Sequence, residues 1–302
     1  MNIAVVLVTF NRLSCLKKAL SKYENQTLKP STILVVDNAS SDGTGEFLDN
    51  WKNIESNICK HVIHNEKNIG GAGGFYTGLQ FSLSINYDYV FLADDDAFAD
   101  DNTFNNLFSN EKLLQDPKTV ALCTTVINQG KIDTSHRCKI KKNLFNIALK
   151  WIPETEYKKD FFKLDIVTFV GAAIKKTTIE KIGLPLKEYF IYYDDTEYFM
   201  RIGKLGNIFC IPKSLMIHNT NGKMSINSWK GYYDTRNWID AVYRHFGMIK
   251  LIQISTLSYI KRCSFIAKLF RKRDYEFRTM CKQAIADAIN HKLGISEIYH
   301  PK

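Results

Sequence analysis

Short apolar runs alternate with segments of helical spacing through the first third of the chain. A continuous apolar run that ends at a polar residue is typical of a strand buried on both faces, and apolar residues three and four positions apart predict a helix. The pattern predicts strands at 3–8, 31–36, 61–64 and 89–93 and helices at 13–20, 43–51 and 75–83. Alternation of strand and helix predicts a parallel sheet with right-handed crossovers, and therefore an α/β fold.

The pattern changes after residue 128. Residues 128–160 are polar and basic, which predicts a loop or an insertion over the sheet. Further strands are predicted at 165–171 and 208–211, a helix at 196–203, and helical structure from 229 to the end. Because no stretch has the composition of a flexible linker, we expect one domain over residues 1–240 and a helical, basic C-terminal extension over residues 241–302.

Composition places the 302-residue chain among globular proteins, with 45% apolar and 24% charged residues. The net charge of +10 indicates an anionic partner, namely nucleic acid, a membrane surface or a phosphorylated substrate, unless it only solvates the surface. The seven cysteines include no CxxC pair, which argues against a four-cysteine zinc site and for free thiols in a reducing compartment. No basic leader precedes the first apolar run, and no apolar run approaches ~18 residues, so we expect a cytoplasmic protein.

Polar residues follow the predicted strands at the edge of the sheet where ligands bind in parallel α/β folds. They are Thr9, Asp37, Asn65 and Asp94. Asp94 opens the run Asp94-Asp95-Asp96, in which adjacent carboxylates repel one another unless a cation or hydrogen-bond donors neutralise them. Such a run can hold a divalent ion and leave positions for phosphate oxygens. The alternative is an acidic turn or a helix N-cap.

The segment 65–75 contains four glycines, Gly70, Gly71, Gly73 and Gly74, before the helix predicted at 75–83. Bare backbone N–H groups and the N-terminus of a helix suit a pyrophosphate. The dinucleotide fingerprint G-x-G-x-x-G is not met, because its third position is Tyr76. Tight packing of a helix on a strand is the alternative reason for these glycines.

Two further polar groups are candidates for a site. After the second strand, Asp37 and Asn38 can accept a hydrogen bond from a base or a ribose, although the same segment reads as a capped helix start. Asp194 and Asp195 lie among aromatic residues, where a carboxylate has a raised pKa and suits a general base. The alternative is again a helix cap. His218 follows a predicted strand, and a lone histidine is more often structural than a ligand.

In this order the motifs resemble glycosyltransferase family 2, the inverting nucleotide-sugar transferases with the GT-A fold, over residues 2–240. The resemblance implies a Rossmann-like, mostly parallel central sheet flanked by helices. It implies a nucleotide-binding set of Thr9, Asn11, Arg12, Asp37, Asn38, Asn68, Gly70, Gly71, Gly73, Asp94 and Asp95. It also implies that Asp94, Asp96 and His218 bind Mn²⁺ or Mg²⁺, and that Asp195 is the base, with Asp194 as the alternative.

Within that family, the segment 68–75 and the triple aspartate look most like the galactofuranosyltransferases and the neighbouring rhamnosyltransferases. The resemblance implies UDP-galactofuranose as donor, with dTDP-rhamnose as the alternative. The acceptor would be a glycan or a polyprenyl-linked glycan in cell-surface polysaccharide synthesis. The polymerising members carry extra domains at both ends, so we expect single additions. Residues 232–237 resemble a segment common in this branch, with a packing role near the acceptor.

The C-terminal segment 259–273 mixes basic and apolar residues at helical spacing. It predicts a helix that lies on an anionic membrane, at the inner face of the cell membrane, or a helix packed on the domain. Nucleic acid is not an expected partner. A sugar-nucleotidyltransferase would need a basic glycine loop near the first strand, and a non-catalytic glycan-binding protein would not need both acidic clusters.

Overall fold

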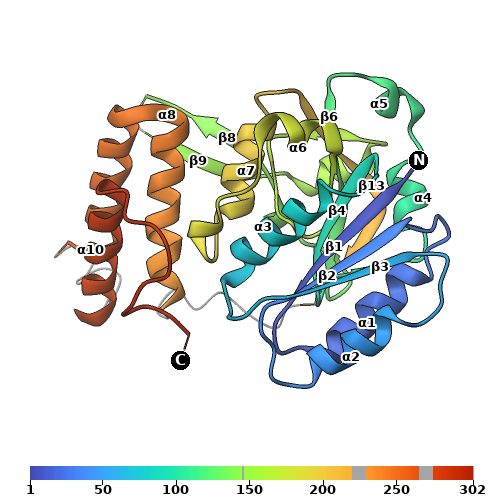
Figure 1. Ribbon diagram of the computed structural model, residues 1–302. Coiled ribbons are helices and arrows are strands. Elements are labelled where there is room, and N and C mark those ends of the chain that lie inside the picture. The colour runs from blue at the N-terminus through green and yellow to red at the C-terminus, as the bar shows by residue number, and fades with distance from the viewer. Residues whose placement is uncertain (145, 220–228, 265–274, 302) are drawn as a thin grey trace.

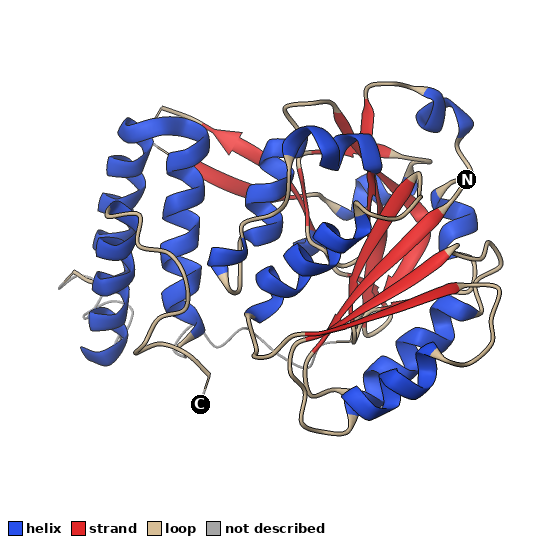
Figure 2. Cartoon of the chain, in the orientation of Figure 1, coloured by secondary structure: helices blue, strands red, loops and turns tan. Residues whose placement is uncertain are grey.

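The protein is described by a computed structural model, which covers residues 1–144, 146–219, 229–264 and 275–301. A large sheet forms its centre, with helices on both faces (Figures 1 and 2). The strand order is β10 (Phe162–Leu164), β13 (Asn207–Ile217), β6 (Thr119–Asn128), β12 (Ala172–Lys175), β4 (Tyr89–Asp94), β1 (Ile3–Thr9), β2 (Thr32–Asp37) and β3 (Cys59–His64).

One half of the sheet is parallel. Strands β4, β1, β2 and β3 pair in parallel and are linked by α1 (Leu13–Glu24), α2 (Thr44–Lys52) and α3 (Gly70–Ser82). Helices α1 and α2 cover one face and α3 the other (Figure 1). All seven residues of β1 are therefore buried, and Val6 and Leu7 belong to the two opposite cores. The α/β prediction and its four strands are confirmed, and their carboxyl ends share one edge.

The other half is mixed, and here the predictions are partly wrong. Strand β12 runs antiparallel to both β4 and β6, and β6 was not predicted. The strand predicted at 165–171 is the short β11 (Ile166–Val167), and β12 begins after it. Residues 128–160, expected to be a loop or an insertion over the sheet, are not a loop, because β8 (Arg137–Lys142) and β9 (Ile147–Trp151) form a second sheet with β11. The lysines of β8 face solvent, so its pattern looked like that of a loop.

Short elements complete the domain. They are β5 (Phe98–Ala99), α4 (Thr103–Leu107), α5 (Glu111–Gln115), β7 (Lys131–Ile132), η1 (Thr134–His136), η2 (Glu154–Lys158), α6 (Lys176–Ile182), η3 (Lys187–Tyr189) and α7 (Asp194–Ile202). Strand β13 ends beside β5, next to the carboxyl end of β4. This arrangement brings the residues after β13 to the same edge of the sheet as Asp94.

Two long helices stand at one end of the molecule (Figure 1). Helix α8 (Lys230–Arg262) bends at Gly247, whose φ is 80°, and packs along α10 (Tyr275–Ile289) around a core of its own. These helices confirm the helical prediction from 229 in part: α8 continues across residue 240, but residues 290–301 after α10 are not helical. Much of the predicted basic segment, 265–273, lies outside the described residues. In the part of the chain described, no helix combines the length and apolarity needed to cross a membrane.

Candidate active site

The ends of β1 and β4 form the first part of the site. These strands are neighbours, and Val8 pairs with Asp94. The Thr9 hydroxyl donates to Asp95 Oδ2 at 2.7 Å. Arg12 Nη1 lies 3.3 Å from Asp95 Oδ1 and donates to Asp96 Oδ2. The half-exposed guanidinium therefore neutralises two of the three carboxylates, as their mutual repulsion requires.

The three aspartates differ in their electrostatic environment. Burial, reinforced by the charges of Asp96 and Asp95, raises the pKa of Asp94 to about 7. Burial also raises the pKa of Asp95 to about 6, against the Thr9 hydrogen bond and the Arg12 charge. Burial acts on Asp96 too, but the hydrogen bond from His218 and the charge of Arg12 together hold its pKa below the usual range. At Asp94, burial and the two neighbouring carboxylates outweigh the charges of His218 and Arg12, so an added cation would favour its charged form.

His218 comes to this cluster from the end of β13. Its Nε2 lies 3.2 Å from Asp96 Oδ1, and its Nδ1 is buried without a hydrogen-bond partner within the described residues. Carboxylate oxygens and an imidazole nitrogen are suitable ligands for Mn²⁺, so the donor set fits a divalent ion. In the described ranges no three His, Cys, Asp or Glu side chains converge tightly enough to enclose one. A bound ion would therefore need further ligands, such as phosphate oxygens or water.

The end of β2 adds buried polar groups whose partners are mainly local. Asp37 Oδ1 accepts from the Ser40 N–H at 3.0 Å, and Asp37 Oδ2 lies 3.3 Å from His64 Nδ1. Asn38 Nδ2 donates to the Gly70 carbonyl at 2.9 Å, so this side chain ties β2 to α3. In the adjoining loop, Asn11 Oδ1 accepts from the Ser41 N–H at 2.7 Å.

The glycine-rich segment is a helix start rather than the loop that was expected. Gly70 to Gly74 form the first turn of α3, and Asn68 Oδ1 accepts from the Gly70 N–H at 2.8 Å. A Cβ on Gly74 would lie 2.4 Å from Val8 Cγ1, so packing on β1 requires a glycine there. A Cβ on Gly71 would have no neighbour within 4 Å. Packing therefore explains Gly74, whereas Gly71 leaves the N-terminus of α3 open to an anion.

The second acidic pair opens α7 from the other side of the site. The N-cap of α7 is Tyr193, which makes no side-chain capping bond, and Asp194 and Asp195 occupy the first turn. Asp195 Oδ1 accepts from the Thr196 N–H at 2.5 Å and from the Thr196 hydroxyl at 3.0 Å. Asp194 is buried, and Asp195 is partly exposed.

The two carboxyl groups have unequal pKa shifts. Burial, together with the charges of Asp195 and Asp94, raises the pKa of Asp194 well above its usual range. Burial raises the pKa of Asp195 only to about 6, because the Thr196 hydrogen bonds and the Arg137 charge oppose it. Asp195 is therefore the member of the pair that ionises more readily. The charge of Asp94 acts on Asp194, which links the two acidic clusters.

Some residues of the site were not found by sequence reasoning. The ring of His136, from η1, lies 5.5 Å from that of His218, and its Nδ1 is 2.8 Å from the Thr168 hydroxyl. Arg137 is fully buried and donates to the carbonyls of Thr124 and Val170 at 2.9 and 2.8 Å. Both residues lie in the segment expected to be a loop. No local pattern distinguishes them from its other basic residues.

Comparison with known proteins finds relatives that are glycosyltransferases. Galactofuranosyltransferase GlfT1 of Mycolicibacterium smegmatis is 24% identical over 221 residues, which cover 71% of this chain and 70% of that protein. The O-antigen chain rhamnosyltransferase RfbN of Salmonella typhimurium is 23% identical over 240 residues, covering 78% of this chain and 71% of that protein. The crystal structure of GalNAc-T7 with UDP, GalNAc and Mn²⁺ aligns with a TM-score of 0.64 and 17% identity, over 96% of this chain and 58% of that one.

The structural likeness extends over the sheet and its helices and shows that the protein has the GT-A fold. The family model described as "Glycosyl transferase family 2" matches residues 4–183, more than half of the chain. That range begins in β1 and includes the first acidic cluster and the start of α3. The chain therefore belongs to glycosyl transferase family 2.

Proposed function

We propose that the protein is an inverting, metal-dependent glycosyltransferase that transfers galactofuranose from UDP-galactofuranose to a glycan or a lipid-linked glycan in cell-surface polysaccharide synthesis. One observation carries the proposal: the charge of Asp94 acts on Asp194, so two acidic clusters lie near each other, and in the second cluster hydrogen bonds from Thr196 leave Asp195 more readily ionised than Asp194. A pair of titratable groups with separated pKa values is the usual arrangement for acid–base chemistry.

The first cluster suits the donor. Asp94, Asp96 and His218 would hold Mn²⁺ or Mg²⁺, and the bound ion would supply positive charge beside the diphosphate. Arg12 already neutralises Asp95 and Asp96 and is half exposed, so its guanidinium can turn to a phosphate once an ion replaces it. The remaining nucleotide-binding residues proposed are Thr9, Asn11, Asp37, Asn38, Asn68, Gly70, Gly71, Gly73, Asp94 and Asp95.

The second cluster suits the acceptor. Asp195, with a pKa of about 6, is ionised at neutral pH and can take the proton of the acceptor hydroxyl. That hydroxyl oxygen attacks the anomeric carbon from the side opposite the leaving diphosphate, and the configuration inverts. The raised pKa of Asp194 favours its neutral form, which would place less negative charge beside the attacking oxygen.

The donor sugar is proposed from the relatives. Similarity to the galactofuranosyltransferase of Mycolicibacterium smegmatis supports UDP-galactofuranose as the donor of this protein. Similarity to the rhamnosyltransferase of Salmonella typhimurium makes dTDP-rhamnose the second candidate. The test is a donor panel that contains both sugars, with product mass and anomeric configuration as the readouts. Transfer of galactofuranose with inversion supports the proposal. A deoxyhexose product selects rhamnose, and a product of retained configuration contradicts the mechanism.

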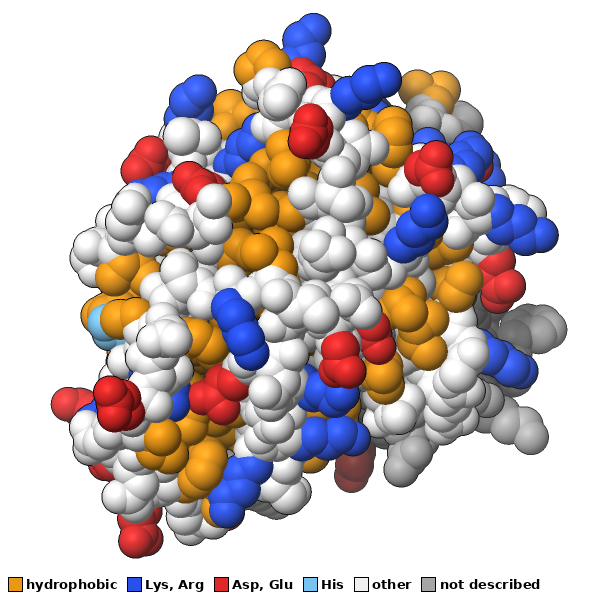
Figure 3. Space-filling model, turned by 90° about the vertical axis from the view of Figure 1, so that its right-hand side faces the viewer, with side chains coloured by type: hydrophobic (Ala, Val, Ile, Leu, Met, Phe, Trp, Pro, Cys, Tyr) orange, Lys and Arg blue, Asp and Glu red, His pale blue; other side chains and the backbone are white. Residues whose placement is uncertain are grey.

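Location at the inner face of the cell membrane is also proposed, for an otherwise cytoplasmic protein. Beyond the bend of α8, Ile249 and Ile252 are 73% and 60% exposed, and Tyr259 and Ile260 continue the same apolar stripe toward Lys261. On the face seen in Figure 3, by contrast, Lys and Arg side chains stand among Asp and Glu side chains. An apolar stripe that ends in basic residues suits an anionic lipid surface, where a lipid-linked acceptor would lie.

Vesicle binding tests this location. The double change Ile249→Asp and Ile252→Asp should weaken sedimentation with vesicles that contain anionic lipid, and salt should weaken binding of the unmodified protein. Ile54→Asp, at an exposed apolar residue that follows α2 and lies away from α8, is the control. Equal binding by the double variant, or no binding by the unmodified protein at low salt, would contradict the membrane proposal and leave the transfer reaction untouched.

A further inference from the structure

The segment that leads into the second acidic pair has an unusual backbone. Phe190, Tyr192 and Tyr193 have φ values of 64°, 67° and 64°, in the left-handed region that bulky residues seldom adopt. Each such residue costs free energy and persists only where its surroundings hold it. Asp194 follows directly, so whatever fixes this segment also fixes the start of α7.

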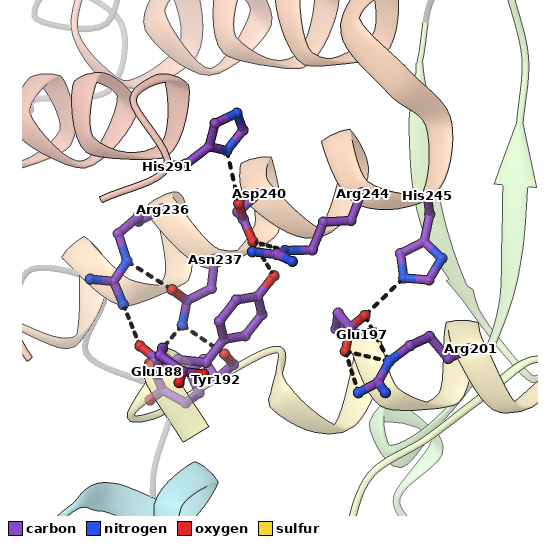
Figure 4. A network of polar contacts seen from close by, with 11 residues as sticks. Glu188, Tyr192, Glu197, Arg201, Arg236, Asn237, Asp240, Arg244, His245 and His291 are labelled. Atoms are coloured by element: carbon purple, nitrogen blue, oxygen red, sulfur yellow. Dashed lines mark hydrogen bonds and ion pairs between the residues drawn. The ribbon is translucent and has the colours of Figure 1, made fainter. Parts of the chain in front are cut away.

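One side chain from α8 makes several hydrogen bonds to the backbone of this segment. Asn237 is fully buried, and its Nδ2 lies 2.9 Å from each of three carbonyl oxygens, those of Tyr189, Ile191 and Tyr192. Figure 4 shows Asn237 between Arg236 and Tyr192. An amide group has two hydrogens, so one is shared between two of the carbonyls. Asn237 Oδ1 accepts from Arg236 Nε at 2.9 Å, which fixes the orientation of the amide. The donor group is therefore aimed at the backbone carbonyls of this segment.

The surrounding contacts connect this segment to α8 and to the donor side of the site. Tyr189 donates to Asp240 Oδ2 at 2.8 Å, and beyond the acidic pair His245 Nε2 lies 3.1 Å from Glu197 Oε1 (Figure 4). On the opposite side, the Phe190 carbonyl accepts from the Ala72 N–H in the first turn of α3 at 3.2 Å. The segment thus lies between α8 and the helix start that faces the donor.

We propose that Asn237 is a positioning residue for the reaction: its amide holds the left-handed segment 190–193 and so aims the Asp195 carboxylate at the acceptor. This inference rests on the proposed function, because it assigns Asn237 a role in the step that Asp195 performs. It also makes the first half of α8 part of the active site.

The variant Asn237→Asp tests the role, since it keeps the size of the side chain and replaces the donor with an acceptor. We expect kcat to fall about 10- to 100-fold, as for the misplacement of a reacting group by about 1 Å, while the affinity for UDP changes less than about threefold. The pKa that the pH–rate profile reports for Asp195 should change as well. Amide exchange in residues 188–195 should be at least about tenfold faster than in the unmodified protein.

A matched control and a second variant keep the test decisive. Tyr198→Phe removes another buried hydrogen bond to a carbonyl, that of Gly183, from the same helix α7, and should leave kcat and the exchange of 188–195 unchanged. If Asn237→Asp does not fold, Asn237→Ser, which is too short to reach the three carbonyls, takes its place.

The outcomes separate this inference from the proposed function. Unchanged kcat and unchanged exchange in a folded Asn237 variant would overturn the positioning role while transfer by the unmodified protein stands. Equal loss of kcat in Tyr198→Phe would also overturn it, because the effect would then be one of stability. If no donor is turned over at all, the proposed function fails. Faster amide exchange of residues 188–195 in the Asn237 variant, but not in Tyr198→Phe, would then still show that Asn237 holds the segment.

Discussion

Gly70 and Gly71 are adjacent in sequence, yet the structure gives them opposite roles. Gly70 has a φ of 75°, and a Cβ built on it would lie 2.0 Å from the Phe190 carbonyl oxygen. Gly71 has an ordinary helical backbone, and a Cβ there would meet nothing within 4 Å. The pair of variants Gly70→Ala and Gly71→Ala therefore tests whether α3 and the segment before the acidic pair are in direct contact.

The structure gives the size of each effect. An alanine in the left-handed region costs ~1–2 kcal/mol, and the forced shift of a backbone carbonyl adds ~1–3 kcal/mol, so Gly70→Ala should lose about 2–5 kcal/mol of unfolding free energy. Gly71→Ala should gain ~0.5–1 kcal/mol, because alanine is the better helix former. Gly71→Ala should separately weaken binding of the donor, because a methyl group at the start of α3 would hinder a diphosphate bound close to that helix start.

Urea unfolding measures the free energy of unfolding of both variants, and calorimetry measures their affinity for UDP. Gly70→Ala should unfold at clearly lower urea than the unmodified protein, and Gly71→Ala at the same or slightly higher urea, with weaker UDP binding. A Gly70→Ala variant within about 1 kcal/mol of the unmodified protein would refute the contact with Phe190. Unchanged UDP affinity in Gly71→Ala would show that the diphosphate does not approach this helix start.

Three further predictions concern the acidic clusters. The transfer rate should fall about tenfold per pH unit below about pH 6, where Asp195 becomes protonated, and a pH–rate profile that stays level to pH 5 would exclude it as the base. Because its pKa is raised, Asp195 binds its proton more tightly in the folded protein than in the unfolded chain. The contribution of Asp195 to stability should therefore decline as pH rises from 3.8 to about 6. Urea unfolding across that pH range measures the decline. UDP binding should be stronger with Mn²⁺ than with chelator, and Asp96→Ala should abolish that difference in calorimetry, whereas Asp101→Ala, at an exposed aspartate, should keep it.

The sequence was informative where structure follows from local pattern. The apolar run of β1 predicts a strand buried on both faces, and its last residue, Thr9, then falls at the ligand-binding edge. Strand β8 was missed because its exposed lysines hide the alternation, and its pairing with β9 and β11 joins segments that no local signal connects. Buried β6 was missed too, since threonines interrupt its apolar run.

The same limit applies to the site. The aspartates after β4 and at the start of α7 stand out as clusters, whereas His136 becomes notable only beside His218. Asn237 belongs to the segment 232–237 that the resemblance marks, but its contact with the strained segment is visible only in the structure. Adjacent carboxyl groups are a further case. Sequence alone separates Asp194 from Asp195 poorly, because their difference comes from Thr196, Arg137 and Asp94 around them.

The rate of sugar transfer by Asp195→Asn, measured beside Asp194→Asn, tests the central proposal most directly. Asparagine keeps the size and hydrogen bonds of the side chain but cannot take the proton of the acceptor hydroxyl. Asp195→Asn should therefore lower kcat ~10²–10⁴-fold and leave UDP affinity nearly unchanged, and Asp194→Asn should lose far less. A crippled Asp194→Asn with an active Asp195→Asn would exchange the two roles. Wild-type rates in both variants would contradict the account, because the second acidic cluster would then serve only the fold.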